Sequence, residues 1–164
     1  MIVRLSKTLL VFLTGVFFLL VGGDNIAAYD INFEFVVHVM SMDTVFPGNT
    51  LTWRAITDPV LHHAVYWLII GAELLTGLLC VAGALRLYKE RYAEAADFDQ
   101  AKAVATAGLV LGFVLFFFGF LTLGAEWFQM WQSTQWNGQQ EAFRMMASVG
   151  IILVFLSLRD AELT

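Results

Sequence analysis

Glu73 is the residue whose position is most suggestive of chemistry, because its carboxyl group lies inside a long apolar stretch. It stands about ten residues into that stretch, on the order of 15 Å from one end at the helical rise per residue. Tyr66, Gly77, Cys80 and Ala84 share its helix face, so we expect Glu73 to point into a bundle rather than at lipid. The functional alternatives are a proton relay, an ion ligand or a substrate contact, and the structural alternative is a protonated glutamate bonded to a neighbouring helix.

Glu126 is a second carboxyl group in an apolar setting. It closes a Gly-Ala-Glu tripeptide that also occurs at Glu73, a match too short to indicate a duplication. Its helical stripe continues through Gly119, Thr122, Gln129 and Ser133. We expect Glu126 to lie nearer the membrane surface than Glu73, where the two carboxyls can still line one cavity, with Tyr66 and Gln129 as further candidate ligands.

Three histidines, His38, His62 and His63, could contribute to a metal site. Asp58 stands four residues before His62, a spacing that brings both side chains to one face of a helix, and a nearby glutamate could join them. However, the sequence has no HxxxH, HExxH or CxxC pattern, and neutral histidines at a membrane interface are commonly just hydrogen-bonded. The structural interpretation of these residues is therefore favoured over metal binding.

Other cofactor and nucleophile chemistry has little support. A bis-histidine haem needs histidines at depth on facing helices, and the apolar stretches contain none. Gly-rich phosphate loops and serine or cysteine nucleophile motifs are also absent. We predict no cofactor, with a metal or a quinone as the ligands that remain open.

Four apolar stretches must position these residues. Of the 164 residues, 59% are hydrophobic and 14% are charged, whereas charged residues make up roughly a quarter of a soluble domain. A spanning helix needs about 20 apolar residues. The stretches that qualify are 5–23, 64–86, 103–126 and 142–158. The sequence thus predicts an all-α protein, a bundle of four transmembrane helices in a single domain, residues 1–164.

Between the first two stretches, the sequence predicts an amphipathic helix on the outer membrane surface. Its apolar residues recur at helical spacing and alternate with a polar stripe: Phe33, Val36, Val37 and Met40 against Glu34, His38 and Ser41. Asp58-Pro59 then gives an N-cap and a first helical residue, so the second long helix should run from Pro59 to about Tyr88. We expect the third to continue to Trp131, and residues 90–100 to form a short solvated helix.

The positions of the basic residues predict the orientation. Seven of the nine lie near the two termini or in the loop between the second and third stretches: Arg4, Lys7, Arg86, Lys89, Arg91, Lys102 and Arg159. By the positive-inside rule, both termini are expected in the cytoplasm, and segments 24–62 and 127–141 are expected outside. All five tryptophans map to that outer side. Nothing in this pattern favours nucleic acid as a partner.

A stripe of small residues on the third stretch predicts close helix packing. Gly108 and Gly112 follow the small-xxx-small pattern, and Gly119 continues it along one side, where another helix can approach closely. Cys80 is the only cysteine, which excludes an internal disulfide and favours an inert packed thiol.

Several longer segments resemble an uncharacterised bacterial family described as predicted small integral membrane proteins. The resemblance is carried by residues 35–44, 51–56, 61–62, 126–133 and 136–139, of which the tryptophan-rich stretch after Glu126 is the most specific. It covers nearly the whole chain and implies a four-span inner-membrane protein. The family brings no established activity, so no catalytic role is implied for any position.

Two hypotheses about function remain. The first is a non-enzymatic accessory or self-associating subunit of a membrane complex, with Gly108, Gly112 and Gly119 at a helix interface. Its partners would be the lipid bilayer and either other membrane subunits or copies of itself. The second is a transport, proton-relay or small-ligand site centred on Glu73 and Glu126.

Overall fold

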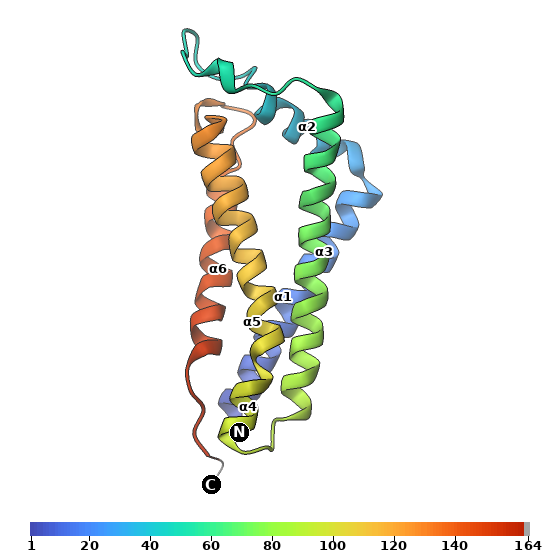
Figure 1. Ribbon diagram of the computed structural model, residues 1–164, viewed down its shortest axis with the longest axis vertical. Helices are drawn as coiled ribbons and strands as arrows, with labels where there is room; N and C mark the ends of the chain where they lie inside the picture. Colours follow the sequence, from blue (N-terminus) through green and yellow to red (C-terminus); the bar gives the residue numbers. More distant parts are fainter. Residues whose placement is uncertain (163–164) are drawn as a thin grey trace.

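The computed structural model describes residues 1–162, and four long helices dominate it (Figure 1). Each is long and apolar enough to cross a membrane. They are α1 (Ile2–Ala27), α3 (Pro59–Lys89), the continuous stretch Ala95–Trp127, and α6 (Gln139–Ser157). No strand occurs within residues 1–162. The prediction of an all-α bundle with four candidate spans is confirmed.

The third long helical stretch consists of three parts with different geometry. They are α4 (Ala95–Ala101), α5 (Ala103–Val114) and the π-helical segment η2 (Leu115–Trp127). In η2 the Thr122 hydroxyl donates to the carbonyl of Phe117, five residues earlier. The expectation of a solvated helix near residue 95 is only half right, because α4 forms but its Phe98 is completely buried.

Glycines lie at close contacts between the helices. A Cβ atom on Gly83 of α3 would lie 2.5 Å from the backbone nitrogen of Ala105 in α5. On the other side of α3, a Cβ on Gly77 would lie 3.0 Å from the carbonyl oxygen of Gly15 in α1. Glycine therefore allows α1, α3 and α5 to pack with their backbones nearly in contact.

The predicted glycine stripe packs inside the chain. A Cβ on Gly108 would lie 2.8 Å from Cys80 Sγ, and one on Gly112 would lie 2.8 Å from the ring of Phe18. These two positions therefore lie at close helix contacts, as the small-residue pattern predicted, and the helices that they meet are α3 and α1 of the same chain. Gly119 differs, since a Cβ there would meet only Leu115 of its own helix, at 3.7 Å.

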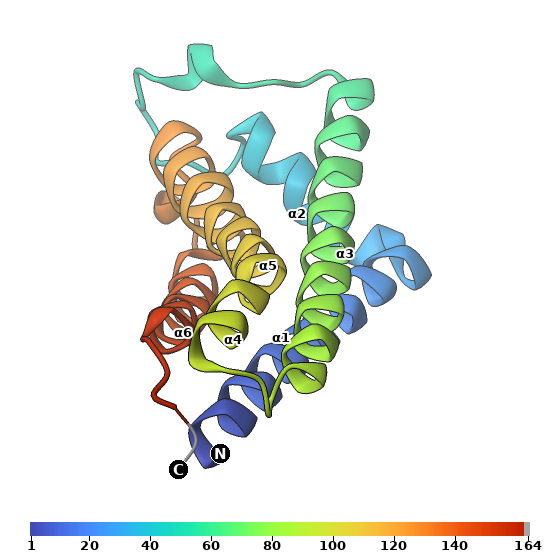
Figure 2. The same cartoon turned by 60° about the horizontal axis from the view of Figure 1, so that its bottom comes forward.

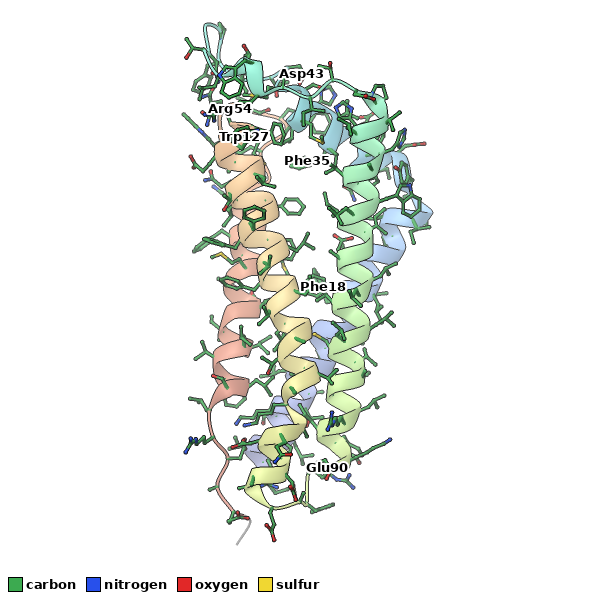
Figure 3. The ribbon with its side chains drawn as sticks, viewed as in Figure 1. Phe18, Phe35, Asp43, Arg54, Glu90 and Trp127 are labelled. Carbon is green, nitrogen blue, oxygen red and sulfur yellow. The ribbon has the colours of Figure 1, made fainter. Side chains whose placement is uncertain are left out.

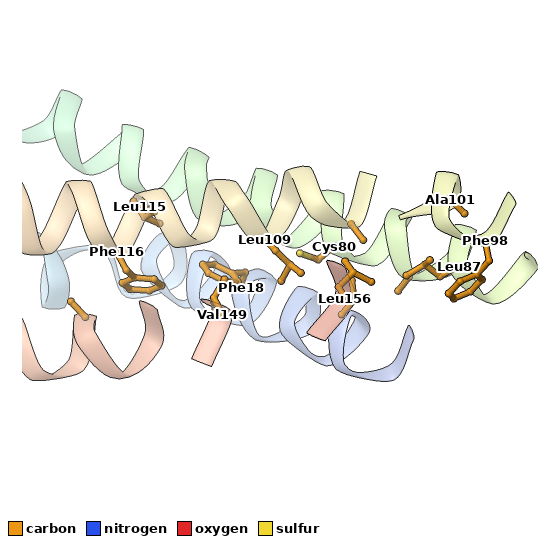
Figure 4. Packing of buried hydrophobic residues seen from close by; sticks show 14 residues of the cluster. Phe18, Cys80, Leu87, Phe98, Ala101, Leu109, Leu115, Phe116, Val149 and Leu156 are labelled. Carbon is orange, nitrogen blue, oxygen red and sulfur yellow. The ribbon is translucent and has the colours of Figure 1, made fainter. Parts of the chain in front are cut away.

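A long apolar core fills the centre of the bundle. Phe18, Cys80 and Leu109 come from three different helices and are completely buried, and Val149 of α6 lies beside them (Figure 4). Cys80 is therefore a packed thiol, as its position in the sequence predicted.

The described chain begins and ends at the same end of the bundle (Figures 1 and 2). We call this the terminal end. The opposite end is closed by residues 28–58 and 128–138, which we call the cap. They include α2 (Tyr29–Ser41) and the short 3₁₀ helices η1 (Thr52–Arg54) and η3 (Met130–Gln132).

Helix α2 packs against protein along its apolar side. Val36 and Met40 lie against Tyr66 and Ile70 of α3, with Phe33 at the edge of this cluster. Val36 and Met40, two residues of the predicted apolar stripe, thus face the bundle rather than a lipid surface.

The third long helix ends four residues earlier than expected. It stops at Trp127, and Gln129 then adopts a left-handed conformation with φ of 56°. This break redirects the chain into η3, where the side-chain oxygen of Gln132 accepts hydrogen bonds from the Phe46 amide and the Asn49 side chain. The expected helix to Trp131 was wrong because these contacts hold the segment in the cap.

Candidate functional site

Glu73 lies at the buried end of a polar network that joins three helices and reaches the surface at Asn32. Glu73 is only 4% exposed. Its Oε2 accepts a hydrogen bond of 2.7 Å from Asn25 Nδ2, near the end of α1. Asn25 Oδ1 in turn accepts one of 2.7 Å from Asn32 Nδ2 in α2. The Tyr66 hydroxyl contacts the Asn25 carbonyl at 3.4 Å. The network thus fastens the corner between α1 and α2 onto α3.

A glycine one turn earlier in α1 allows this contact. A Cβ on Gly22 would lie 2.8 Å from Leu74 and 3.4 Å from the Cβ of Glu73. The inward orientation of Glu73 and Tyr66 was predicted correctly, but Asn25 and Asn32 were missed. The available signal was the presence of two asparagines next to the outer end of the first apolar stretch.

Glu126 lies in a different part of the molecule. It is exposed and lines a groove of about 720 Å³ between η2 and α6, together with Arg144. Gln129 donates to the backbone carbonyl of Glu126, not to its carboxylate. The structure therefore does not bring Glu73 and Glu126 into one cavity.

The three histidines have separate partners. His62 is buried, and its Nε2 lies 2.7 Å from the carbonyl oxygen of Ile56. His63 Nδ1 lies 2.8 Å from the Tyr29 hydroxyl. His38 Nδ1 lies 2.7 Å from a carboxylate oxygen of Asp43.

The fourth residue of the candidate metal set has a structural task. Asp58 caps α3, because its Oδ1 accepts a hydrogen bond from the Val60 amide. Within residues 1–162 no three His, Cys, Asp or Glu side chains are grouped to hold a metal ion. The structure does not bring Asp58, His38, His62 and His63 together.

A buried charge cluster at the terminal end was not predicted. Asp160 Oδ2 lies 2.6 Å from Lys7 Nζ and 2.6 Å from Lys102 Nζ, and both ammonium groups also donate to the Leu158 carbonyl. Burial alone would raise the pKa of Asp160, but hydrogen bonds and charge attraction from the two lysines hold it below its usual range. One carboxylate therefore joins α1, the third helical stretch and the segment after α6.

Arg4 extends this cluster. Its guanidinium donates to the backbone carbonyls of Arg91, Ala93 and Ala161, and lies 4.7 Å from the ring of Phe98. Sequence reasoning used these cations only to assign orientation. An acidic residue soon after the last span was the signal that they could be paired.

An apolar pocket of about 480 Å³ lies between α2, α3 and η2. Towards the cap, α3 and the third helical stretch diverge (Figure 1). Every residue that lines the pocket is apolar or glycine, among them Phe35, Val39, Leu68, Ile69, Leu111, Phe118, Gly119 and Trp127. The sequence did not predict this pocket, which depends on the angle between helices.

Arg54 lies in the cap beside Trp127, which lines this pocket (Figure 3). Its guanidinium carbon lies 4.6 Å from the ring centre of Trp127, which lines the pocket, and 5.4 Å from that of Trp53. The only hydrogen bond of its side chain within residues 1–162 is a long one, 3.4 Å from Nη1 to the Trp127 carbonyl. The site thus combines an apolar chamber with a cation that stacks on one of the residues in its wall.

Comparison with curated proteins and with solved structures finds no match to the chain. A family model does match, over residues 3–159, which include the buried network, the apolar pocket and the cap. The chain therefore belongs to the family described as "Predicted small integral membrane protein (DUF2165)", in agreement with its four apolar helices.

Proposed function

We propose that the protein is a non-enzymatic membrane subunit that holds an apolar component of the membrane in the pocket between α2, α3 and η2. One observation carries this proposal: a chamber of about 480 Å³ has a wall made only of apolar residues and glycine. Ligand pockets of small molecules have volumes of roughly 300–1,000 Å³ and mostly apolar walls. The chamber is large enough for part of a lipid or for a quinone tail.

The contacts of Glu73 favour positioning over proton transfer. A relay needs a series of titratable groups or waters that leads from one side of the membrane to the other. The partners of Glu73 are the amide of Asn25 and, beyond it, that of Asn32. Glu126, the second carboxyl of the relay hypothesis, lines a separate groove. We therefore assign Glu73 to holding the corner of α1 and α2.

We infer an accessory role, in a membrane complex or a self-assembly, from the small size of the segments outside the four helices. Residues 28–58 are the longest of them, and they fold onto the bundle as part of the cap. We further propose a bacterial inner-membrane location with the terminal end in the cytoplasm. The basic residues support this orientation, since only Arg54 and Arg144 of the nine belong to the opposite half.

Native mass spectrometry of protein extracted gently from its own membrane tests the proposal. In Gly119→Leu the new side chain would project from the pocket wall, where a Cβ has room. Gly71→Leu is the matched control, because Gly71 is exposed on α3 and a Cβ there meets nothing within 4 Å.

We expect the native protein and Gly71→Leu to carry about one apolar molecule per chain, and Gly119→Leu to retain about tenfold less. An empty native protein, or equal occupancy of the two variants, would overturn the proposal. Fixed partner subunits recovered with all three proteins would support the accessory role.

A further inference from the structure

We infer that the molecule held in the pocket is a phospholipid, with an acyl chain between α3 and η2 and its phosphate on Arg54. This inference rests on the proposed function and names its ligand. It is carried by the juxtaposition of a cation and an apolar chamber through Trp127, which lines the chamber and stacks on the Arg54 guanidinium at 4.6 Å.

The guanidinium of Arg54 has donors to spare. Its Nη1 makes a long bond of 3.4 Å to a carbonyl, and its Nε has no hydrogen-bond partner. No carboxylate among residues 1–162 lies within 4.0 Å of it, whereas Arg144, the other cation of this half, pairs with Glu141 at 2.6 Å. A planar guanidinium binds phosphate oxygens in a bidentate manner, so a phosphate is the complement that Arg54 lacks.

The depth of Arg54 matches that of a phosphate group. Helix η2 ends at Trp127, and tryptophans settle at the level of lipid headgroups. From Trp127 the pocket wall extends along the third helical stretch to Leu111, roughly 24 Å at 1.5 Å per residue. One leaflet of a hydrocarbon core about 30 Å thick is about 15 Å deep, so the wall is long enough for an acyl chain of one leaflet.

The pocket can be reached from the bilayer. Leu68 on α3 and Phe118 on η2 both line it, yet they are 72% and 53% exposed on the side of the bundle. An acyl chain can therefore enter laterally, between the two helices, without crossing the cap. Quinone headgroups are neutral and would leave the charge of Arg54 uncompensated, so the anionic lipid is the better complement.

The test uses the full-length protein in detergent micelles with two probes that have the same chains. Dioleoyl phosphatidylglycerol carries the phosphate, and dioleoylglycerol lacks it. Binding is measured by native mass spectrometry for the native protein, Arg54→Gln, Arg54→Lys and a control, Arg91→Gln. Arg91 also stacks on two aromatic rings, those of Tyr88 and Tyr92, but it lies at the terminal end.

We expect the native protein and Arg91→Gln to prefer the phospholipid by at least about tenfold, the effect of a hydrogen bond to a charged group. Arg54→Gln should lose this preference but still bind dioleoylglycerol, and Arg54→Lys should keep part of it. The unfolding midpoint of each variant shows whether it is folded, and Arg54→Lys supplies the comparison if Arg54→Gln is not.

Two failures can be told apart. Equal binding of the two lipids by the native protein, or tighter binding of a quinone with a chain of similar length, would overturn the assignment of the phosphate while leaving an apolar ligand in place. Binding of neither lipid, together with equal behaviour of Gly119→Leu and Gly71→Leu, would overturn the proposed function itself.

Discussion

Gly83 and Ala105 bring the backbones of α3 and α5 into close contact, because a Cβ on Gly83 would lie 2.5 Å from the Ala105 backbone nitrogen. The obstacle is backbone in the middle of a helical stretch, so it cannot rotate away as a side chain could. This one contact brings α3 and α5 together at their terminal halves, below the region in which the pocket forms (Figure 1).

We expect Gly83→Ala to destabilise the protein by about 1–3 kcal/mol, because the added methyl group forces the two helices apart. Denaturant unfolding in detergent, followed by circular dichroism, measures this. Gly71→Ala should instead be neutral or stabilising by about 0.5–1 kcal/mol, because alanine is the better helix former and nothing lies near its Cβ. Equal stability of the two variants would contradict the packing described here.

Substitution of Glu73 separates shape from charge. Glu73→Gln keeps an oxygen that can accept the Asn25 hydrogen bond, so we expect its unfolding free energy to change by less than about 1 kcal/mol. Glu73→Leu leaves the buried amide of Asn25 without this partner, and should cost about 1–3 kcal/mol. If Glu73→Gln abolished a cellular function while the protein stayed fully stable, the ionisable group would be needed and the positioning role would fail.

The Asp160 cluster predicts a pH-dependent part of the stability. The pKa of Asp160 is lowered in the folded protein, so its contribution is fully present above the ordinary value of 3.8 and is lost as pH falls through the lower native value. At pH 7 we expect Asp160→Asn to unfold about 1.5–3 kcal/mol more easily than the native protein. Unfolding measured from pH 7 to pH 3 should show this difference shrink at the acidic end.

Asp99→Asn is the control for that experiment. Asp99 contacts Lys102 at 2.5 Å but is one third exposed, so removal of its charge should cost less than about 1 kcal/mol. A larger effect at Asp99 than at Asp160 would show that the buried carboxylate does not hold the terminal end together.

Cysteine labelling in intact cells tests the proposed orientation. A cysteine at Asn49 in the cap should react with a membrane-impermeant maleimide added outside, and one at Arg91 only after the membrane is opened. Cys80 is completely buried and should remain silent in both cases. The reverse pattern would place the terminal end outside the cell.

Local signals in the sequence were sufficient for the helices but not for their contacts. The predicted helix N-cap at Asp58 and the start of α3 at Pro59 are confirmed. A side-chain acceptor followed by proline specifies a helix start within a few residues. The end of the third long helix was misjudged. There the break at Gln129 is enforced by Gln132 and its partners in residues 46–49, which are far away in sequence.

The candidate site was predicted only in part, because local signals in the sequence do not specify contacts between helices. The periodicity of the sequence identifies which face of a helix is buried, and it correctly predicted that Glu73 and Tyr66 point inward. It does not identify the residue on the facing helix, which depends on crossing angles and on close contacts such as the one at Gly22. Asn25 and the apolar pocket therefore became apparent only in the structure.

The cluster around Asp160 also has a consequence for biogenesis. Lys7 receives both of its hydrogen-bond partners, and Arg4 one of its three, from residues 158–161, which emerge more than 150 residues later, after the last span. Until then, the ammonium group of Lys7 must remain hydrated or be neutralised by lipid. Insertion of the four helices and closure of the bundle are thus separate events, and closure waits for nearly the whole described chain to leave the ribosome.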